Sequence, residues 1–185
     1  MGSPAELRGQ SGSRPEIGEA VALHRQGRLR EAERIYASIL AENPGQFELL
    51  RTRPELVPSL VSEIIRYHTP VLHMRRTARR DVELSGRKVR AGDKVVMWYI
   101  SGNRDEDKIE RADEFIVDRT KPRQHLAFGA GIHRCVGDRL AEQQLRILWE
   151  EILKRELRFE IAGPAKRLYS NFIRGIRSLP VRIAS

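Results

Sequence analysis

One short segment of the sequence combines the only cysteine of the chain with closely spaced glycines. It runs from Phe128 to Gly137 and reads FGAGIHRCVG. A thiolate that ligates a metal must be deprotonated, held rigidly and supplied with hydrogen bonds. Cys135 lies where a helix is predicted to begin, and the positive end of the helix dipole favours the thiolate. Gly129, Gly131 and Gly137 permit a near approach to a flat ligand, while Arg134 adds positive charge and Phe128 can shield the sulfur.

A second segment places an acid and a base three residues apart. Residues 55 to 68 have helical periodicity, and Pro70 stops the predicted helix. Glu63 and Arg66 fall inside it, and positions three apart share one face of a helix, so their side chains can pair. The same spacing is common in surface salt bridges, so by itself it identifies no function.

The remaining segments predict an α+β fold that is mostly α. Residues 82 to 84 and 87 to 89 alternate around a turn at Ser85-Gly86, which predicts a hairpin. Residues 94 to 100 (KVVMWYI) have the strongest β signal, and their continuous apolar run predicts burial. Residues 101 to 134 contain no long periodic segment, which is unusual unless such a stretch is functional.

The C-terminal part predicts one long helix followed by short strands. The helix is expected from about Val136 to Arg155. Its buried side is expected to consist of Leu140, Ala141, Leu145, Leu148, Trp149 and Ile152. Short strands are expected at residues 157 to 161, near Leu168, and at 180 to 183.

The cysteine segment resembles the haem-binding signature of the cytochrome P450 family. The matching pattern is F-x-x-G-x-x-x-C-x-G, with Ala141 four residues after its last glycine. The resemblance covers residues 44 to 185 and implies a partial cytochrome P450 fold. It implies haem b as the cofactor, with the thiolate of Cys135 as the axial ligand that binds the iron. The implied activity is that of an oxidoreductase, an oxygen-dependent monooxygenase.

The same resemblance assigns roles to further side chains. Arg119 is expected to join Glu63 and Arg66 in a buried structural triad. His133 and Arg76 are expected to bind the haem propionates, with Arg75 as a competing candidate. Phe128, Gly129, Gly131 and Gly137 complete the cofactor-binding set.

Substrate contacts are expected on two segments, Val71-Leu72-His73 and Asn171-Phe172-Ile173. Apolar residues at these positions suit a small hydrophobic substrate, and they could equally belong to the core. Electrons are expected from an acidic, ferredoxin-type donor. The cations that could receive such a donor are Arg134, Arg139 and Arg146.

The N-terminal part has a different character. Residues 1 to 15 are rich in Gly, Ser and Pro, which predicts a disordered tail without a signal peptide. Residues 16 to 43 resemble one tetratricopeptide repeat, with Gly27 at the turn, Ala32 and Tyr36 four apart and Pro44 at the close. A single repeat cannot bury its own apolar faces, so a protein partner is expected, and an ordinary helical hairpin is the alternative.

Upstream of Glu63 the sequence has no acid–alcohol pair of the kind that delivers protons to oxygen in this family, and no catalytic residue is identified. We therefore expect a truncated chain that binds haem weakly and has little or no activity alone. The alternative hypothesis is a non-catalytic, tetratricopeptide-like interaction module fused to a degenerate haem domain.

Composition narrows the remaining possibilities. The formal net charge is +9, but neither a zinc-ligand pattern nor an aromatic-studded basic stretch is present, so nucleic-acid binding is not expected. No apolar run is long enough to span a bilayer. One cysteine forms no intrachain disulfide, and we expect a cytoplasmic protein.

Overall fold

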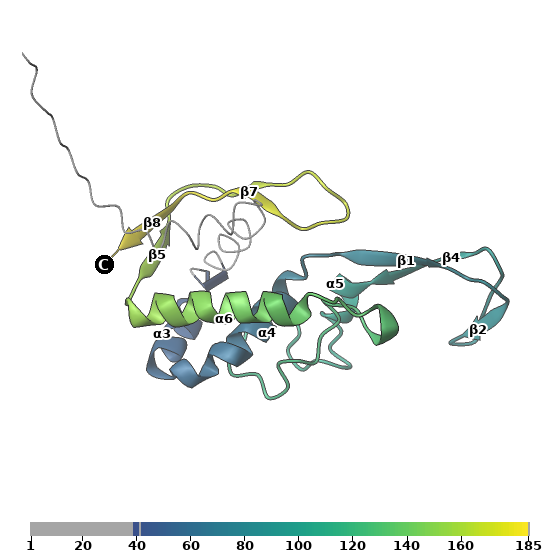
Figure 1. Cartoon of the computed structure of the whole chain (residues 1–185), viewed down its shortest axis with the longest axis horizontal. Helices are drawn as coiled ribbons and strands as arrows, with labels where there is room; N and C mark the ends of the chain where they lie inside the picture. Colours follow the sequence, from purple (N-terminus) through teal and green to yellow (C-terminus); the bar gives the residue numbers. More distant parts are fainter. Residues whose placement is uncertain (1–38, 41, 185) are drawn as a thin grey trace, which may run out of the picture.

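The computed structural model describes residues 39, 40 and 42–184 (Figure 1). The predicted tail at 1–15 and nearly all of the predicted tetratricopeptide-like hairpin at 16–43 lie outside these residues. The elements are, in chain order, α3 (Pro44–Thr52), a 3₁₀ turn (Pro54–Leu56), α4 (Val57–His68), β1 (His73–Thr77), β2 (Val82–Leu84), β3 (Arg87–Val89), β4 (Lys94–Trp98), α5 (Tyr99–Gly102), a 3₁₀ turn (Gly131–His133), α6 (Asp138–Lys154), β5 (Arg158–Ile161), β6 (Lys166–Arg167), β7 (Ile176–Ser178) and β8 (Val181–Ala184). This is the α+β mixture that the sequence predicts.

The core lies where α4 packs against α6. Leu60 and Ile64 of α4 are fully buried, and Trp149 of α6 is only 1% exposed. Because α4 lies at the centre of the molecule, nine of its twelve residues are buried, including the polar Glu63 and Arg66. None of the helices among the described residues is long and apolar enough to cross a membrane.

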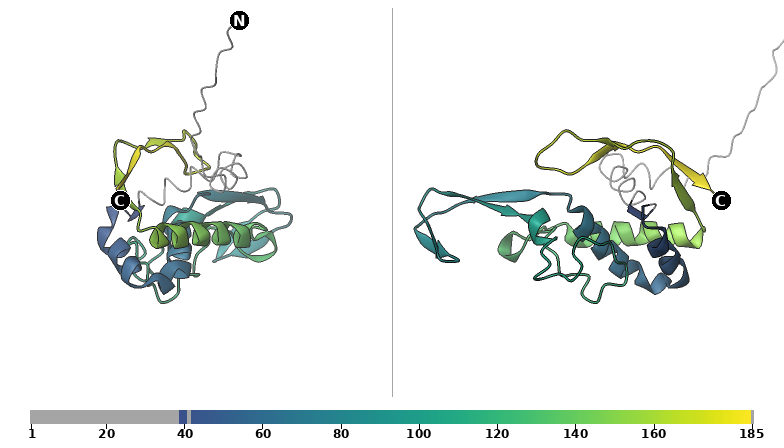
Figure 2. Two further views of the ribbon diagram at one scale, coloured as in Figure 1. Left: turned by 60° about the vertical axis from the view of Figure 1, so that its left-hand side comes forward. Right: turned by 180° about the vertical axis from the view of Figure 1, so that it is seen from behind.

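The strands form four separate antiparallel pairs, β1–β4, β2–β3, β5–β8 and β6–β7. Figures 1 and 2 show β1, β4 and the β2–β3 hairpin extending beyond the helices at one end, with β5–β8 at the other. Ser85 and Gly86 have φ values of 49° and 75°, which is the turn geometry that matches the twist of a two-residue hairpin. The predicted hairpin and its turn are therefore confirmed.

Three predictions about elements were wrong in detail. The strand predicted at 94–100 ends at Trp98, because β1 ends its pairing there and the chain turns into α5. The predicted burial of this strand was wrong, since Val96 is 41% and Trp98 55% exposed. Leu140, predicted to be buried, is 63% exposed, because it lies on the first turn of α6 beside the cysteine loop.

Candidate functional site

The cysteine loop, residues 128–137, is closed by backbone hydrogen bonds. The Cys135 amide donates to the Phe128 carbonyl at 2.9 Å, and the Arg134 amide donates to the Gly131 carbonyl at 3.0 Å. Gly129 and Gly131 have φ values of 71° and 67°, a region that favours glycine. A Cβ at Gly129 would lie only 3.0 Å from Tyr99 Oη, so the backbone conformation favours glycine there and a larger residue would also require Tyr99 to shift.

The Cys135 thiol is free and exposed to solvent. Around it, Ile132, Val136 and Leu140 are 97%, 102% and 63% exposed. A Cβ at Gly137 would stand 3.9 Å from Cys135 Sγ, an ordinary van der Waals contact, so Gly137 lies directly beside the sulfur. An exposed thiol in a segment with exposed apolar side chains fits a flat, apolar group that contributes a metal ion, as haem does.

The three arginines proposed for an electron donor lie on α6 or just before it, and each is paired with a carboxylate of α6. Arg134 Nε lies 2.7 Å from Asp138 Oδ2, and this hydrogen bond lowers the pKa of Asp138. Arg146 pairs with Glu150 at 2.9 Å, and Arg139 lies 3.8 Å from Glu142. The three arginines predicted to receive an electron donor are therefore exposed, but their positive charges are partly neutralised by carboxylates.

The predicted triad of Glu63, Arg66 and Arg119 comes together in the structure. Arg66 Nε and Nη2 each lie 2.8 Å from a Glu63 oxygen, and Arg119 donates from Nε and Nη2 at 3.1 and 3.2 Å. The Ile116 amide adds a fifth donor at 2.9 Å. Burial raises the pKa of Glu63, but the hydrogen bonds from the two arginines outweigh it and hold the pKa below its ordinary value.

The triad also fastens the irregular stretch after β4 to α4. Arg66 Nη1 donates to the carbonyls of Asn103 and Ala112 at 2.8 and 2.6 Å. Arg119 donates to the carbonyl of Arg111 at 3.1 Å. The long segment without secondary structure is thus held by two arginine side chains.

Sequence reasoning missed Asn103, which is fully buried. Its Nδ2 donates to Thr69 Oγ1 at 2.9 Å, and its Oδ1 accepts from the Leu126 amide at 2.6 Å. It thereby connects the end of α4 to the approach to the cysteine loop. Its place just after a strong strand signal was the only hint in the sequence.

The register of β1 with β4 separates the two candidate arginines. Arg75 pairs with Val96, so it shares a face with Trp98, whereas Arg76 pairs with Val95 and lies on the opposite face. The side of β4 that carries Val96 and Trp98 is its more exposed side. The Arg76 guanidinium donates to the Arg75 carbonyl at 3.1 Å. The two arginines therefore lie on opposite faces of the β1–β4 pair, and both are exposed. His133 is exposed two residues before Cys135.

The two segments expected to contact substrate lie side by side. Val71 and Ile173 form a β-bridge, and the Leu72 amide donates to the Phe172 carbonyl at 3.0 Å. The His73 ring packs edge-on against Phe172 and Trp98, with centroid distances of 5.7 and 4.8 Å. Sequence reasoning missed Trp98, because an apolar run does not show which strand neighbour a side chain meets. We call His73, Trp98 and Phe172 the aromatic row.

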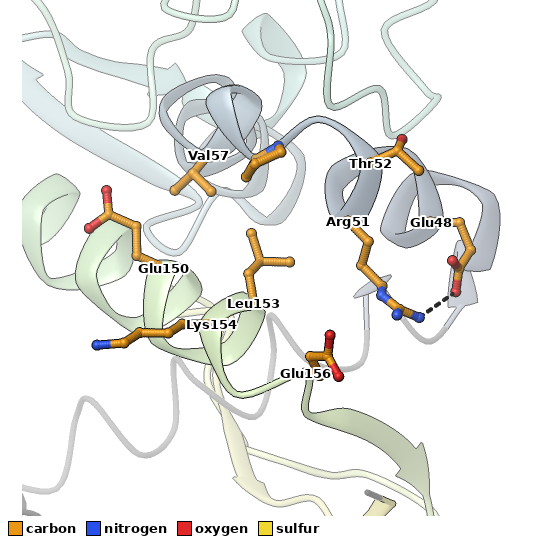
Figure 3. A pocket seen from close by; sticks show the side chains of 9 residues that line it. Glu48, Arg51, Thr52, Val57, Glu150, Leu153, Lys154 and Glu156 are labelled. Atoms are coloured by element: carbon orange, nitrogen blue, oxygen red, sulfur yellow. Dashed lines mark hydrogen bonds and ion pairs between the residues drawn. The ribbon is translucent and has the colours of Figure 1, made fainter.

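Two cavities lie elsewhere in the described part of the chain. One of about 480 Å³ opens between α3 and the end of α6, where acidic and basic side chains surround Val57 and Leu153 (Figure 3). The other, of about 450 Å³, is lined by residues of the irregular stretch, including Arg119. Neither is lined by Cys135 or by the aromatic row, so neither gathers the residues that the sequence singled out.

Comparisons with known proteins agree with this geometry. The family model described as Cytochrome P450 matches residues 49–170. Linalool 8-monooxygenase of Pseudomonas putida is 49% identical over 142 residues, which are 77% of this chain and 35% of that protein. The methyl-branched lipid omega-hydroxylase of Mycobacterium bovis is 47% identical over 130 residues, 68% of this chain and 29% of that protein.

The solved structure of cytochrome P450-153 from Novosphingobium aromaticivorans matches with a TM-score of 0.81 and 50% identity, and the match covers 84% of this chain and 39% of that chain. The chain spans about a third of the length of the curated relatives that it matches. The agreement of fold, family model and sequence identity shows that the chain belongs to the cytochrome P450 family.

Proposed function

We propose that this chain is the haem-binding part of a cytochrome P450 monooxygenase that hydroxylates a small hydrophobic substrate. The observation that carries the proposal is the Cys135 thiol, which is exposed in a hydrogen-bonded glycine loop and flanked by exposed apolar side chains. When bound, haem b with a thiolate ligand supplies the activation of O₂ that places one oxygen atom in a C–H bond of the substrate.

The residues of the loop prepare the sulfur for this role. Cys135 would provide the thiolate ligand of the iron, and Phe128, whose carbonyl accepts from the Cys135 amide, would help shield the sulfur from water. Arg134, whose Cζ lies 5.7 Å from the Phe128 ring centroid, keeps positive charge nearby. His133 and one arginine of β1 bind the propionates, and of Arg75 and Arg76 the strand register favours Arg75.

The aromatic row forms a wall for the substrate. Its members come from β1, from the end of β4 and from the C-terminal loop, and Trp98 and Phe172 are 55% and 38% exposed. Val71 and Leu72 extend the same wall. The names of two relatives, a linalool monooxygenase and a lipid omega-hydroxylase, support an apolar substrate.

The electron donor is an acidic, ferredoxin-type protein that docks near Cys135 in the cytoplasm. The net charge of +9 favours such a partner. The exposed cations Arg134, Arg139 and Arg146 lie on or next to α6, and their carboxylate partners limit the strength of the attraction. We therefore expect docking to be salt-dependent.

Haem binds weakly to this chain alone, and coupled hydroxylation is weak or absent. The exposed side chains of Ile132, Val136 and Leu140 would cover only the haem face that Cys135 binds, so the opposite face would have little apolar cover from the described residues. No residue in the described part of the chain is assigned to proton delivery.

The test is a reduced-plus-carbon-monoxide difference spectrum of the full chain mixed with haemin. The expected result is the Soret shift of a thiolate-ligated haem, which Cys135→Ser abolishes and Arg146→Gln retains. The same spectrum in wild type and Cys135→Ser would remove the basis for a thiolate site.

A further inference from the structure

Two segments far apart in the sequence are joined at the end of α4 by a reciprocal pair of hydrogen bonds. His68 Nε2 lies 2.6 Å from the Arg174 carbonyl oxygen, and Arg174 Nη1 donates to the His68 carbonyl at 3.3 Å. The His68 residue is only 5% exposed. We call this pair the His68–Arg174 latch.

The chemistry of the latch fixes the state of the imidazole. A carbonyl oxygen only accepts, so Nε2 must carry the proton that it donates to Arg174. Burial lowers the pKa of His68 to about 4, and the charges of Arg174 and Arg167 act in the same direction. A neutral imidazole has one N–H group, and here that group is directed at the Arg174 carbonyl.

The latch continues into the wall of the substrate site. The Arg174 amide donates to the Pro70 carbonyl at 2.9 Å, and the Leu72 amide to the Phe172 carbonyl at 3.0 Å, with the Val71–Ile173 bridge between them. These bonds place Phe172 beside His73, where their ring centroids are 5.7 Å apart.

The loop that carries Phe172 has little other support. It lies between β6, which ends at Arg167, and β7, which begins at Ile176. Within it, Ser170 Oγ accepts from the amides of Phe172 and Ile173 at 3.1 and 3.0 Å, which shapes the turn but does not attach it to the body. Attachment comes from the latch and the short backbone pairing next to it.

We propose that His68 is a positioning residue, which acts through Arg174 to hold Phe172 in the aromatic row and so sets the affinity of the site for apolar substrates. This inference rests on the proposed function of the aromatic row. It assigns no direct contact with substrate to His68, which is 5% exposed.

The experiment compares His68→Gln, whose amide can still donate, with His68→Phe, which fills the space without a donor. Amide hydrogen exchange at Leu72 and Arg174 reports the latch. The change in Trp98 emission on addition of 1-decanol reports apolar binding, because Trp98 is 55% exposed whereas Trp149 is 1% exposed. Both measurements use the full chain without haem.

The expected result is at least tenfold faster exchange and at least fivefold weaker 1-decanol binding in His68→Phe, with His68→Gln within twofold of wild type in both. Val57→Ala, at the other end of α4, is the matched control. It should lower the thermal midpoint and leave 1-decanol affinity within twofold.

If His68→Phe does not fold, Arg174→Gln removes the guanidinium half of the latch, and a two- to threefold loss of affinity is expected.

Unchanged exchange in folded His68→Phe or Arg174→Gln would overturn the latch. Faster exchange with unchanged 1-decanol affinity would mean that the latch is only a structural crosslink, and would overturn the positioning role of His68. Equal losses of 1-decanol affinity in His68→Phe and Val57→Ala would also overturn the positioning role. So would the absence of 1-decanol binding by the wild type. The carbon monoxide spectrum with haem is independent of these outcomes, so it reports separately on the proposed function.

Discussion

Gly129 and Gly131 of the cysteine loop both have a backbone conformation that favours glycine, but they differ in the space around them. Gly129 combines a left-handed backbone with a close neighbour, whereas Gly131 has the same kind of backbone, φ 67°, with nothing within 4 Å of an added Cβ. The two positions therefore separate backbone strain from steric overlap. Strain at such a φ costs about 1–2 kcal/mol for a residue other than glycine.

We predict that Gly129→Ala lowers haem affinity and stability more than Gly131→Ala does. Adding Tyr99→Phe to Gly129→Ala removes the Oη atom at 3.0 Å and leaves Cζ at 3.6 Å, an ordinary contact. The double variant should therefore recover to the level of Gly131→Ala. Haemin titration and thermal unfolding measure both effects, and no recovery would show that Tyr99 does not limit residue 129.

A second residue-scale prediction concerns the propionate cation of β1. Arg75 shares the exposed face of Trp98 and Arg76 does not, so Arg75→Gln should weaken haem binding about tenfold, the value of one charge-assisted hydrogen bond. Arg76→Gln is the matched control and should change affinity less than threefold. Equal effects in a haemin titration would mean that the strand face does not decide which arginine binds.

At the scale of elements, the buried network around Glu63 joins α4 to the irregular stretch. We predict that Glu63→Gln lowers the free energy of unfolding by about 3–5 kcal/mol, because two arginines lose their counter-charge inside the protein. Glu114→Gln is a matched control, since Glu114 pairs with Arg111 at the same three-residue spacing, at 2.5 Å, but on the surface. Its removal should change little, as is usual for exposed pairs. Urea unfolding compares the two variants.

The pattern of success and failure across elements has a physical explanation. The Glu63–Arg66 pair, its partner Arg119 and the Ser85-Gly86 turn could be predicted, because they depend on local spacing or on a family pattern. The exposure of Trp98 and Leu140 could not, because burial depends on what covers an element and not on its own periodicity. Helix α3 was missed because Pro44 was interpreted as an end, whereas proline at the first helical position also begins helices.

Over the whole molecule, haem should act as a stabilising ligand. The unfolded chain has no ordered site, so haem that binds the folded chain stabilises it by about 2.7 kcal/mol at a free concentration of one hundred times the dissociation constant. We predict that the thermal midpoint rises with haemin concentration in wild type and much less in Cys135→Ser. Equal rises in both proteins would indicate adsorption of haemin to exposed apolar side chains.

Among the residues that the structure describes, two buried histidines make stability depend on pH near neutrality. Burial is the main cause that lowers the pKa values of His68 and His125 to about 4, against 6.5 for a free histidine. Between pH 6.5 and 4 the unfolded chain therefore binds more protons than the folded chain, so stability falls as the pH falls and is constant above this window. For His68 alone the shift corresponds to about 3 kcal/mol. Glu63, whose pKa is lowered, loses its contribution at still lower pH.

We predict that urea midpoints measured from pH 7.5 to 4.5 decline below pH 6.5, and that His68→Gln makes the decline shallower. Glutamine keeps a donor for the Arg174 carbonyl but binds no proton, so the stability at pH 7.5 should change little while the slope decreases. A slope identical to that of wild type would mean that His68 is not the group whose proton uptake drives the decline. In that case His125→Asn should make the decline shallower, because burial lowers the pKa of His125 to about 4 as well.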